Sequence, residues 1–131
     1  MSGTWQEVVS GEDAAVYAYG LAGARLSGTA RERAERSRRE HRLLRARAAQ
    51  LVTDSGGAVP TPAIAYDIDD VSLDRDQAQA LLAQVELALI PIYAQAAGES
   101  IGPDRARAAR SATECASRAT AWGAPPEAFP D

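Results

Sequence analysis

The sequence predicts an all-α protein, a four-helix bundle in which two antiparallel helical hairpins are joined by a long crossover strap. Apolar residues recur with helical spacing in four segments of about twenty residues each. The first and last connections are short, as between antiparallel neighbours, whereas the middle connection is long and contains proline. A length of 131 residues suits one core of ordinary size, so we expect residues 1–131 to form a single domain.

The composition is typical of a globular bundle with a core of small side chains. Hydrophobic residues make up 46% of the chain but aromatic residues only 5%, so Ala, Leu and Val must form most of the core. The single cysteine, Cys115, excludes an intrachain disulfide and a thiolate metal cage. The amino terminus lacks the basic and apolar blocks of a signal peptide, and no segment approaches about eighteen uninterrupted apolar residues. We therefore expect a cytoplasmic protein without membrane contact.

The first predicted helix spans residues 4–26 and carries an acid on its apolar face. Val8, Glu12, Tyr19 and Leu26 belong to this face, and Glu12 and Tyr19 lie two turns apart, so their side chains stack. A carboxylate among apolar residues needs a partner, because an unpaired buried charge is strongly unfavourable. Glu12 is therefore the first candidate site residue.

The second predicted helix spans residues 30–53, after a turn at residues 27–29. Thr29 is its expected N-cap, and Glu32, three residues later, completes a capping box. The inward stripe of this helix includes Ala34, His41 and Leu44. His41, the only histidine in the chain, falls near the helix centre and is the second candidate.

The outer faces of this second helix are basic. Nine arginines occur from Arg25 to Arg47, against only Glu32, Glu35 and Glu40. Such a helix could meet nucleic acid. We do not favour that interpretation, because the whole chain carries a net charge of −4, no aromatic residues alternate with the arginines, and glutamates are spaced as their helical partners. A solvated or dimer-facing helix is expected instead.

The crossover strap covers residues 58–71, where Pro60 and Pro62 enforce an extended backbone. Its acidic segment, Asp67 to Asp76, resembles part of a calcium loop but lacks the glycine and the terminal bidentate glutamate that such a loop requires. Helix capping or pairing with the basic helix is the favoured role of these carboxylates. Apolar residues that alternate along the strap are expected to lie against the bundle: Ile64, Tyr66 and Ile68.

The third predicted helix spans residues 74–97, and the fourth spans residues 103–122. Glu86 and Tyr93 share the inward face of the third helix, and Pro91 between them is expected to kink or locally widen it. Cys115 and Trp122 belong to the inward face of the fourth helix. Outside that inward set lie Glu114 and Arg118, so a surface ion pair with four-residue spacing is expected there.

Helical phase predicts that Glu12, His41 and Glu86 converge inside the bundle, with Tyr19 and Tyr93 close by. Two interpretations of this cluster remain open. In the first, protonated His41 bridges two buried acids in a charge-assisted hydrogen-bond network. Alternatively, two carboxylates and one imidazole hold a single divalent metal, for which iron, manganese and zinc are suitable.

Several segments resemble a known family. These are the run from Glu12 to Leu26, the segment from Glu40 to Arg45, the proline-containing strap that ends at Tyr66, and the tail Trp-Gly-Ala-Pro-Pro-Glu-Ala-Phe-Pro. Together they resemble an uncharacterised family of ferritin-like domains, a domain of unknown function typical of high-GC bacteria. The resemblance covers nearly the whole chain and implies a ferritin-like four-helix bundle, but it implies no activity.

The wider ferritin-like superfamily implies a di-metal carboxylate site, with a glutamate from each of two helices and a Glu-x-x-His pair from each of the others. This chain departs from that pattern, because Arg38 stands three residues before His41 and Ser117 stands three residues after Glu114. We therefore expect a degenerate di-iron site and no cofactor. The protein is expected to be a non-catalytic binding or interaction module that forms a homodimer or binds another protein. The alternative is a metal-binding oxidoreductase with an atypical site at Glu12, His41 and Glu86.

Overall fold

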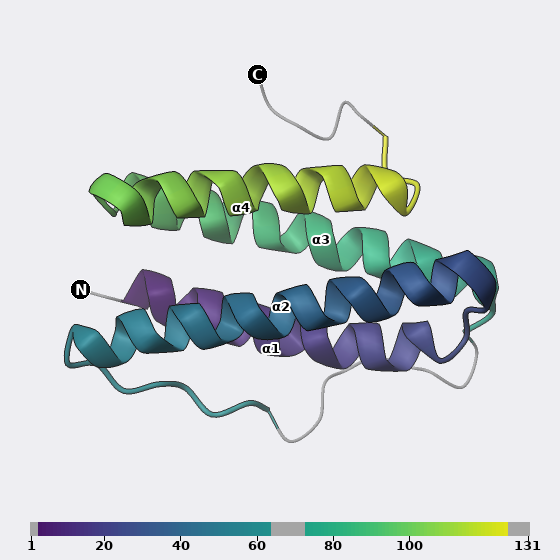
Figure 1. The fold of residues 1–131 in the computed structure, drawn as a ribbon, viewed down its shortest axis with the longest axis horizontal. Helices are drawn as coiled ribbons and strands as arrows, with labels where there is room; N and C mark the ends of the chain where they lie inside the picture. Colours follow the sequence, from purple (N-terminus) through teal and green to yellow (C-terminus); the bar gives the residue numbers. More distant parts are fainter. Residues whose placement is uncertain (1–2, 64–72, 126–131) are drawn as a thin grey trace.

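The computed structural model confirms an all-α fold with four helices over the residues that it describes, 3–63 and 73–125 (Figure 1). The strap residues from Ile64 to Asp70 and the tail residue Phe129, for which packing or capping roles were expected, lie outside the described residues. The helices are α1 (Gly3–Gly23), α2 (Gly28–Asp54), α3 (Arg75–Gly98) and α4 (Gly102–Ala121).

The four helices lie roughly side by side along one long axis (Figure 1). Helix α1 packs against α2 and α3, and α3 also packs against α4. Figure 1 shows that α2 runs back along α1 and that α4 runs back along α3. Helices α1 and α3 thus make the central contact of the bundle, and each also contacts one outer helix.

The contact between α1 and α3 is close because a glycine lies in it. A Cβ atom placed on Gly11 would stand 3.0 Å from Cδ2 of Leu89 and 3.2 Å from Cδ1 of Ile92. These distances are tight for any added carbon, so the missing side chain allows the two helix axes to approach. This approach brings Glu12, the next residue, toward α3.

The turn between α1 and α2 differs from the predicted one. Helix α1 ends at Gly23 rather than Leu26, because the amide of Leu26 bonds the Gly23 carbonyl at 3.1 Å in a tight turn. Thr29 is not the N-cap: Ser27 occupies that position, without a side-chain cap bond, and Gly28 follows with φ of +60°. Glycine adopts this conformation readily, so the chain enters α2 before it reaches Thr29.

The ends of α3 and α4 carry clear local signals. Asp74 caps α3 in a capping box: its carboxylate accepts from the Gln77 amide at 2.8 Å, and the Gln77 side chain accepts from the Asp74 amide at 2.9 Å. Helix α3 continues unbroken through Pro91. Helix α4 has Pro103 in its opening turn, where the missing amide hydrogen removes no helical bond.

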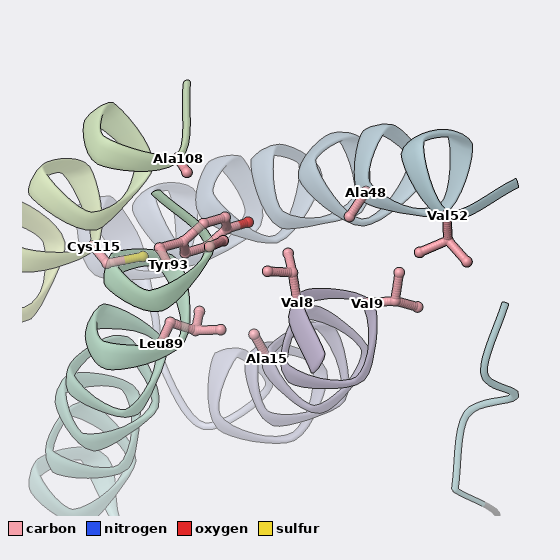
Figure 2. Close-up of a cluster of buried hydrophobic side chains, with 10 residues drawn as sticks. Val8, Val9, Ala15, Ala48, Val52, Leu89, Tyr93, Ala108 and Cys115 are labelled. Carbon is pink, nitrogen blue, oxygen red and sulfur yellow. The ribbon is translucent and has the colours of Figure 1, made fainter. Parts of the chain in front are cut away.

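Two apolar clusters form the core, one toward each end of the bundle. Figure 2 shows the first cluster, in which Val8 and Val9 of α1 lie on the side of Ala48 and Val52 of α2, while Leu89 and Tyr93 of α3 lie near Cys115 of α4. The second cluster gathers around Tyr19, Leu82 and Trp122. Three charged or polar residues of α1, α2 and α3 are buried together with these apolar clusters, namely Glu12, His41 and Glu86.

Helix α3 carries almost no charge beyond its first two residues. From Gln77 to Gly98 its only ionisable acid is Glu86, which is fully buried. By length and composition alone, α3 is the one described helix that is apolar enough to span a membrane, a test that core helices of soluble proteins also pass.

Candidate functional site

The structure brings the three predicted residues together at the centre of the bundle. His41 Nδ1 lies 2.5 Å from Glu12 Oε1, and His41 Nε2 lies 2.7 Å from Glu86 Oε2. All three side chains have no solvent-exposed surface. Carboxylates only accept hydrogen bonds, so an imidazole between two of them donates from both nitrogens and is an imidazolium.

Two tyrosines also donate hydrogen bonds to these carboxylates and thereby link α1 to α3. Tyr93 of α3 donates to Glu12 Oε2 at 2.5 Å, and Tyr19 of α1 donates to Glu86 Oε2 at 2.6 Å. Each helix carries a glutamate and, seven residues later, a tyrosine. Because α1 and α3 run in opposite directions, each tyrosine reaches the glutamate of the other helix.

Arg118 also belongs to the site, although its place in the sequence predicted a surface position. Its Nε donates to Glu86 Oε2 at 3.1 Å, and its Nη1 lies 3.7 Å from Glu40. The expected surface pair with Glu114 is therefore wrong: the Arg118 side chain is only 15% exposed and turns toward the buried carboxylate. The spacing held a signal, because Arg118 follows the buried residues Ser111 and Cys115 by seven and three positions.

Trp122 extends the network at the end of α4. Its indole Nε1 donates to the Tyr19 hydroxyl at 2.8 Å, so that hydroxyl both accepts from Trp122 and donates to Glu86. Trp122 was predicted to face inward, and its indole is also covered by the guanidinium of Arg33 of α2 at 5.4 Å. The chain of contacts from Tyr93 to Trp122 therefore involves all four helices or their ends.

The charges of the network hold His41 protonated. Burial alone lowers the pKa of His41, but the hydrogen bonds to Glu12 and Glu86 and the charges of these two acids outweigh it and raise the pKa to about 9. Burial likewise raises the pKa of Glu86, but His41 and Arg118 reverse this effect and lower it below its ordinary value. At neutral pH the cluster therefore contains an imidazolium, a guanidinium and two carboxylates, which balance in charge.

Burial and neighbouring carboxylates keep the tyrosines protonated. Burial followed by the charge of Glu86 raises the pKa of Tyr19, and burial followed by the charge of Glu12 raises that of Tyr93. Burial also raises the pKa of the Cys115 thiol, whose sulfur lies 3.6 Å from Arg118 Nη2. Both hydroxyls are thus fixed donors, and the thiol is neutral.

The residues present do not fit a di-metal centre. Both imidazole nitrogens already contact carboxylates, so His41 offers no free lone pair, and the guanidinium of Arg118 supplies a positive charge beside Glu86. Arg38, which replaces the first glutamate of the Glu-x-x-His pattern, packs against Gly20 of α1. In the described part of the chain, no three His, Cys, Asp or Glu side chains are grouped to hold a metal ion.

One atom of the cluster has no partner. Glu86 Oε1 is buried without a hydrogen bond to any described group, although Oε2 of the same carboxylate accepts three. Buried polar atoms of this kind commonly bond a water or an ion. Glu86 Oε1 is therefore the one position in the cluster that offers a further acceptor.

Of three hollows that the described residues line, the smallest, of about 120 Å³, reaches Tyr19 of the network. A hollow of about 580 Å³ between α1 and α3 is lined by side chains outside the network: Gln6, Glu7, Ser10, Gly11, Pro60, Pro91, Ile92 and Gln95. A second hollow of about 380 Å³ touches only Trp122 of the network. Neither hollow reaches His41 or either carboxylate.

Fold and cluster together define an all-α four-helix protein with a buried, charge-balanced Glu-His-Glu-Arg network. The chain belongs to the family described as a domain of unknown function (DUF4439), whose model matches residues 4–131. The fold is similar to the crystal structure of a conserved hypothetical protein, Rv2844, from Mycobacterium tuberculosis, with a TM-score of 0.85, 21% sequence identity and 92% of each chain covered. A comparison with curated proteins gives no match.

Proposed function

We propose that the protein is a non-catalytic interaction module of ferritin-like arrangement, in which a degenerate di-iron site has become a structural ion-pair network. The observation that carries this proposal is the double use of His41. Each imidazole nitrogen contacts a carboxylate, at 2.5 Å and 2.7 Å, in a fully buried position. A catalytic base or metal ligand needs a free nitrogen and a path for substrate, and His41 has neither in this arrangement.

Charge balance supports a structural role. A divalent cation added to two carboxylates and Arg118, with His41 neutral, leaves a net charge of +1 in a buried site, whereas the protonated network is neutral. A buried unbalanced charge is strongly unfavourable. The network thus satisfies its own charges without a cofactor.

Association with a second copy is part of this proposal, and α3 supplies the supporting observation. Its outward residues between Gln77 and Gly98 carry no charge, and several small or apolar ones are exposed, among them Ala80, Ala88, Pro91 and Ala94. Two copies of a chain with net charge −4 repel each other least through an uncharged face. Size-exclusion chromatography with light scattering measures this association, and Ala88→Glu is expected to abolish it.

The test of the non-catalytic role is elemental analysis of untagged protein purified without chelator. We expect less than about one tenth of an equivalent of iron, manganese or zinc, and no uptake of added metal. The matched variant is Glu12→Gln, which is expected to destabilise the fold less than loss of His41. We expect it to contain equally little metal. Near-stoichiometric metal in the wild type that is lost in Glu12→Gln contradicts the proposal.

The alternative, a metal-binding oxidoreductase, is favoured by one observation, the unpartnered Oε1 of Glu86. In that case Glu12, His41 and Glu86 would hold one iron, manganese or zinc ion, after one imidazole nitrogen gave up its proton. Metal binding would then release a proton and strengthen as pH rises. Measuring metal uptake at pH 6 and pH 9 tests this signature directly.

A further inference from the structure

The outer face of α2 presents arginines around an exposed leucine. Arg36, Arg39, Leu43 and Arg47 are spaced by three, four and four residues, so they lie on one side of the helix. We call these four residues the outer basic face. They lie opposite the buried stripe that contains His41, and Leu43 is 68% exposed.

Two other arginines of α2 pair with carboxylates, whereas the arginines of the outer basic face pair with none among the described residues. Arg31 pairs with Glu35 at 3.5 Å, and Arg45 pairs with Asp13 at 3.0 Å. By contrast, no carboxylate of the described chain lies within 4.0 Å of the guanidinium groups of Arg36, Arg39 and Arg47. These three cations are therefore available to an outside partner.

The arrangement of charge and apolar surface specifies the chemistry of that partner. Arg39 and Arg47 lie one turn before and one turn after Leu43, so the leucine lies between two guanidinium groups. A helix with carboxylates one turn on either side of an apolar residue matches this pattern, because it pairs each guanidinium and covers Leu43.

We propose that the outer basic face binds an acidic amphipathic segment of another protein. This inference rests on the proposed function as an interaction module and names its partner surface. Nucleic acid matches the face less well, because Leu43 lies at its centre and Glu32 and Glu40 border it. A second copy of the chain would bring arginines against arginines, which is repulsive.

The experiment is fluorescence anisotropy with a labelled eighteen-residue helical peptide that has glutamate at every turn and one central leucine. The double charge reversal Arg39→Glu/Arg47→Glu is expected to weaken binding by at least about tenfold, and Leu43→Ser by about fivefold. The matched control is Arg107→Glu/Arg110→Glu on α4, which makes the same change of charge on exposed residues of another helix. Binding by this control is expected to stay within about twofold of wild type.

Four outcomes overturn the inference. Equal loss in the α4 control, or no effect of Leu43→Ser, shows that the peptide responds to net charge rather than to this face. Tighter binding of an eighteen-base-pair DNA duplex through the same arginines assigns the face to nucleic acid. Loss of a dimer in Arg39→Glu/Arg47→Glu assigns it to a second copy. None of these substitutions touches the buried network, so elemental analysis judges the non-catalytic role independently.

Discussion

The two carboxylates of the network are held in different ways. Glu12 uses its two oxygens separately, one for His41 and one for Tyr93. Glu86 concentrates three donors on Oε2 and leaves Oε1 unpartnered. Glu12 thus joins α1 to α2 and α3, whereas Glu86 joins α3 to α1, α2 and α4.

This difference indicates which half of the network depends on charge. Arg118 contacts Glu86 and has no counterpart at Glu12, so the Glu86 half contains a second cation that needs its carboxylate. The Glu12 half contains only His41 and a neutral tyrosine. Substitutions should therefore affect the two halves unequally, except at His41, which belongs to both.

The largest effect is expected for His41→Ala, which breaks both halves at once. It leaves two buried carboxylates without their shared cation, and loss of one partner of a buried ion pair costs about 3–5 kcal/mol. Urea unfolding followed by circular dichroism measures the change in the free energy of unfolding. Arg42→Ala, an exposed neighbour on α2, is the control and should change it by less than about 0.5 kcal/mol. Similar stability of the two variants would contradict a bridging role for His41.

The second-largest effect is expected for the glutamates, and it should differ between the Glu86 half and the Glu12 half of the network. Glu86→Gln should destabilise by about 3 kcal/mol, because it leaves both His41 and Arg118 without a buried anion, and Glu12→Gln by about half as much. The same urea titration compares them. Equal losses would mean that Arg118 relaxes into solvent and that the halves are equivalent.

Stability should also depend on pH through His41, the only histidine in the chain. Its pKa in the folded state, about 9, lies above the ordinary value of 6.5, so its stabilisation is complete below pH 6.5 and is lost as pH rises through 9. The loss is about 3 kcal/mol, since one pKa unit corresponds to about 1.4 kcal/mol. The lowered pKa of Glu86 acts oppositely, because its stabilisation is lost as pH falls below 4.5.

Unfolding free energies measured from about pH 2 to about pH 10 test the loss at basic pH and the loss at acidic pH. Glu12→Gln should move the loss of stability at basic pH toward lower pH, because it removes one of the two groups that raise the pKa of His41. NMR titration of the imidazole gives the same pKa directly. A value near 6.5 would show that His41 is neutral in the folded protein.

The smallest effects are expected at the tyrosines. Tyr93→Phe removes one hydrogen bond to Glu12, and Tyr19→Phe removes one to Glu86 and one from Trp122. We expect losses of about 1 kcal/mol and about 2 kcal/mol in thermal or urea unfolding. A larger loss of stability for Tyr93→Phe than for Tyr19→Phe would contradict the expectation that the Glu86 half is the more sensitive one.

The fold and most of the network could be predicted because they follow from helical phase. Glu12, His41, Glu86 and both tyrosines lie at positions where the apolar stripe itself points inward. Helical phase gave only a partial signal for Arg118, because its spacing from Ser111 and Cys115 is helical but does not show that its long side chain reaches Glu86. The hydrogen bond between Trp122 and Tyr19 depends on where two helices cross. The spacing of residues within one helix does not give that position.

Helix ends were predicted less well, and for a local reason. Gly28 has the positive φ that starts α2 ahead of Thr29, and from sequence either Ser27 or Thr29 could have served as the cap. The capping box at Asp74 was easier to place, because an acid stands just before the apolar pattern begins and Gln77 follows three residues later.

The long sequence separations within the network have a kinetic consequence. Tyr19 and Glu86 are 67 residues apart, Glu12 and Tyr93 are 81 apart, and Tyr19 and Trp122 are 103 apart. Such contacts close only when helices from both ends of the chain have docked, after the local helices have formed. Weakening the network should therefore speed unfolding and leave the refolding rate nearly unchanged, which stopped-flow measurements on Tyr19→Phe can resolve. The buried ion pairs would then set the lifetime of the native state rather than the speed at which it is reached.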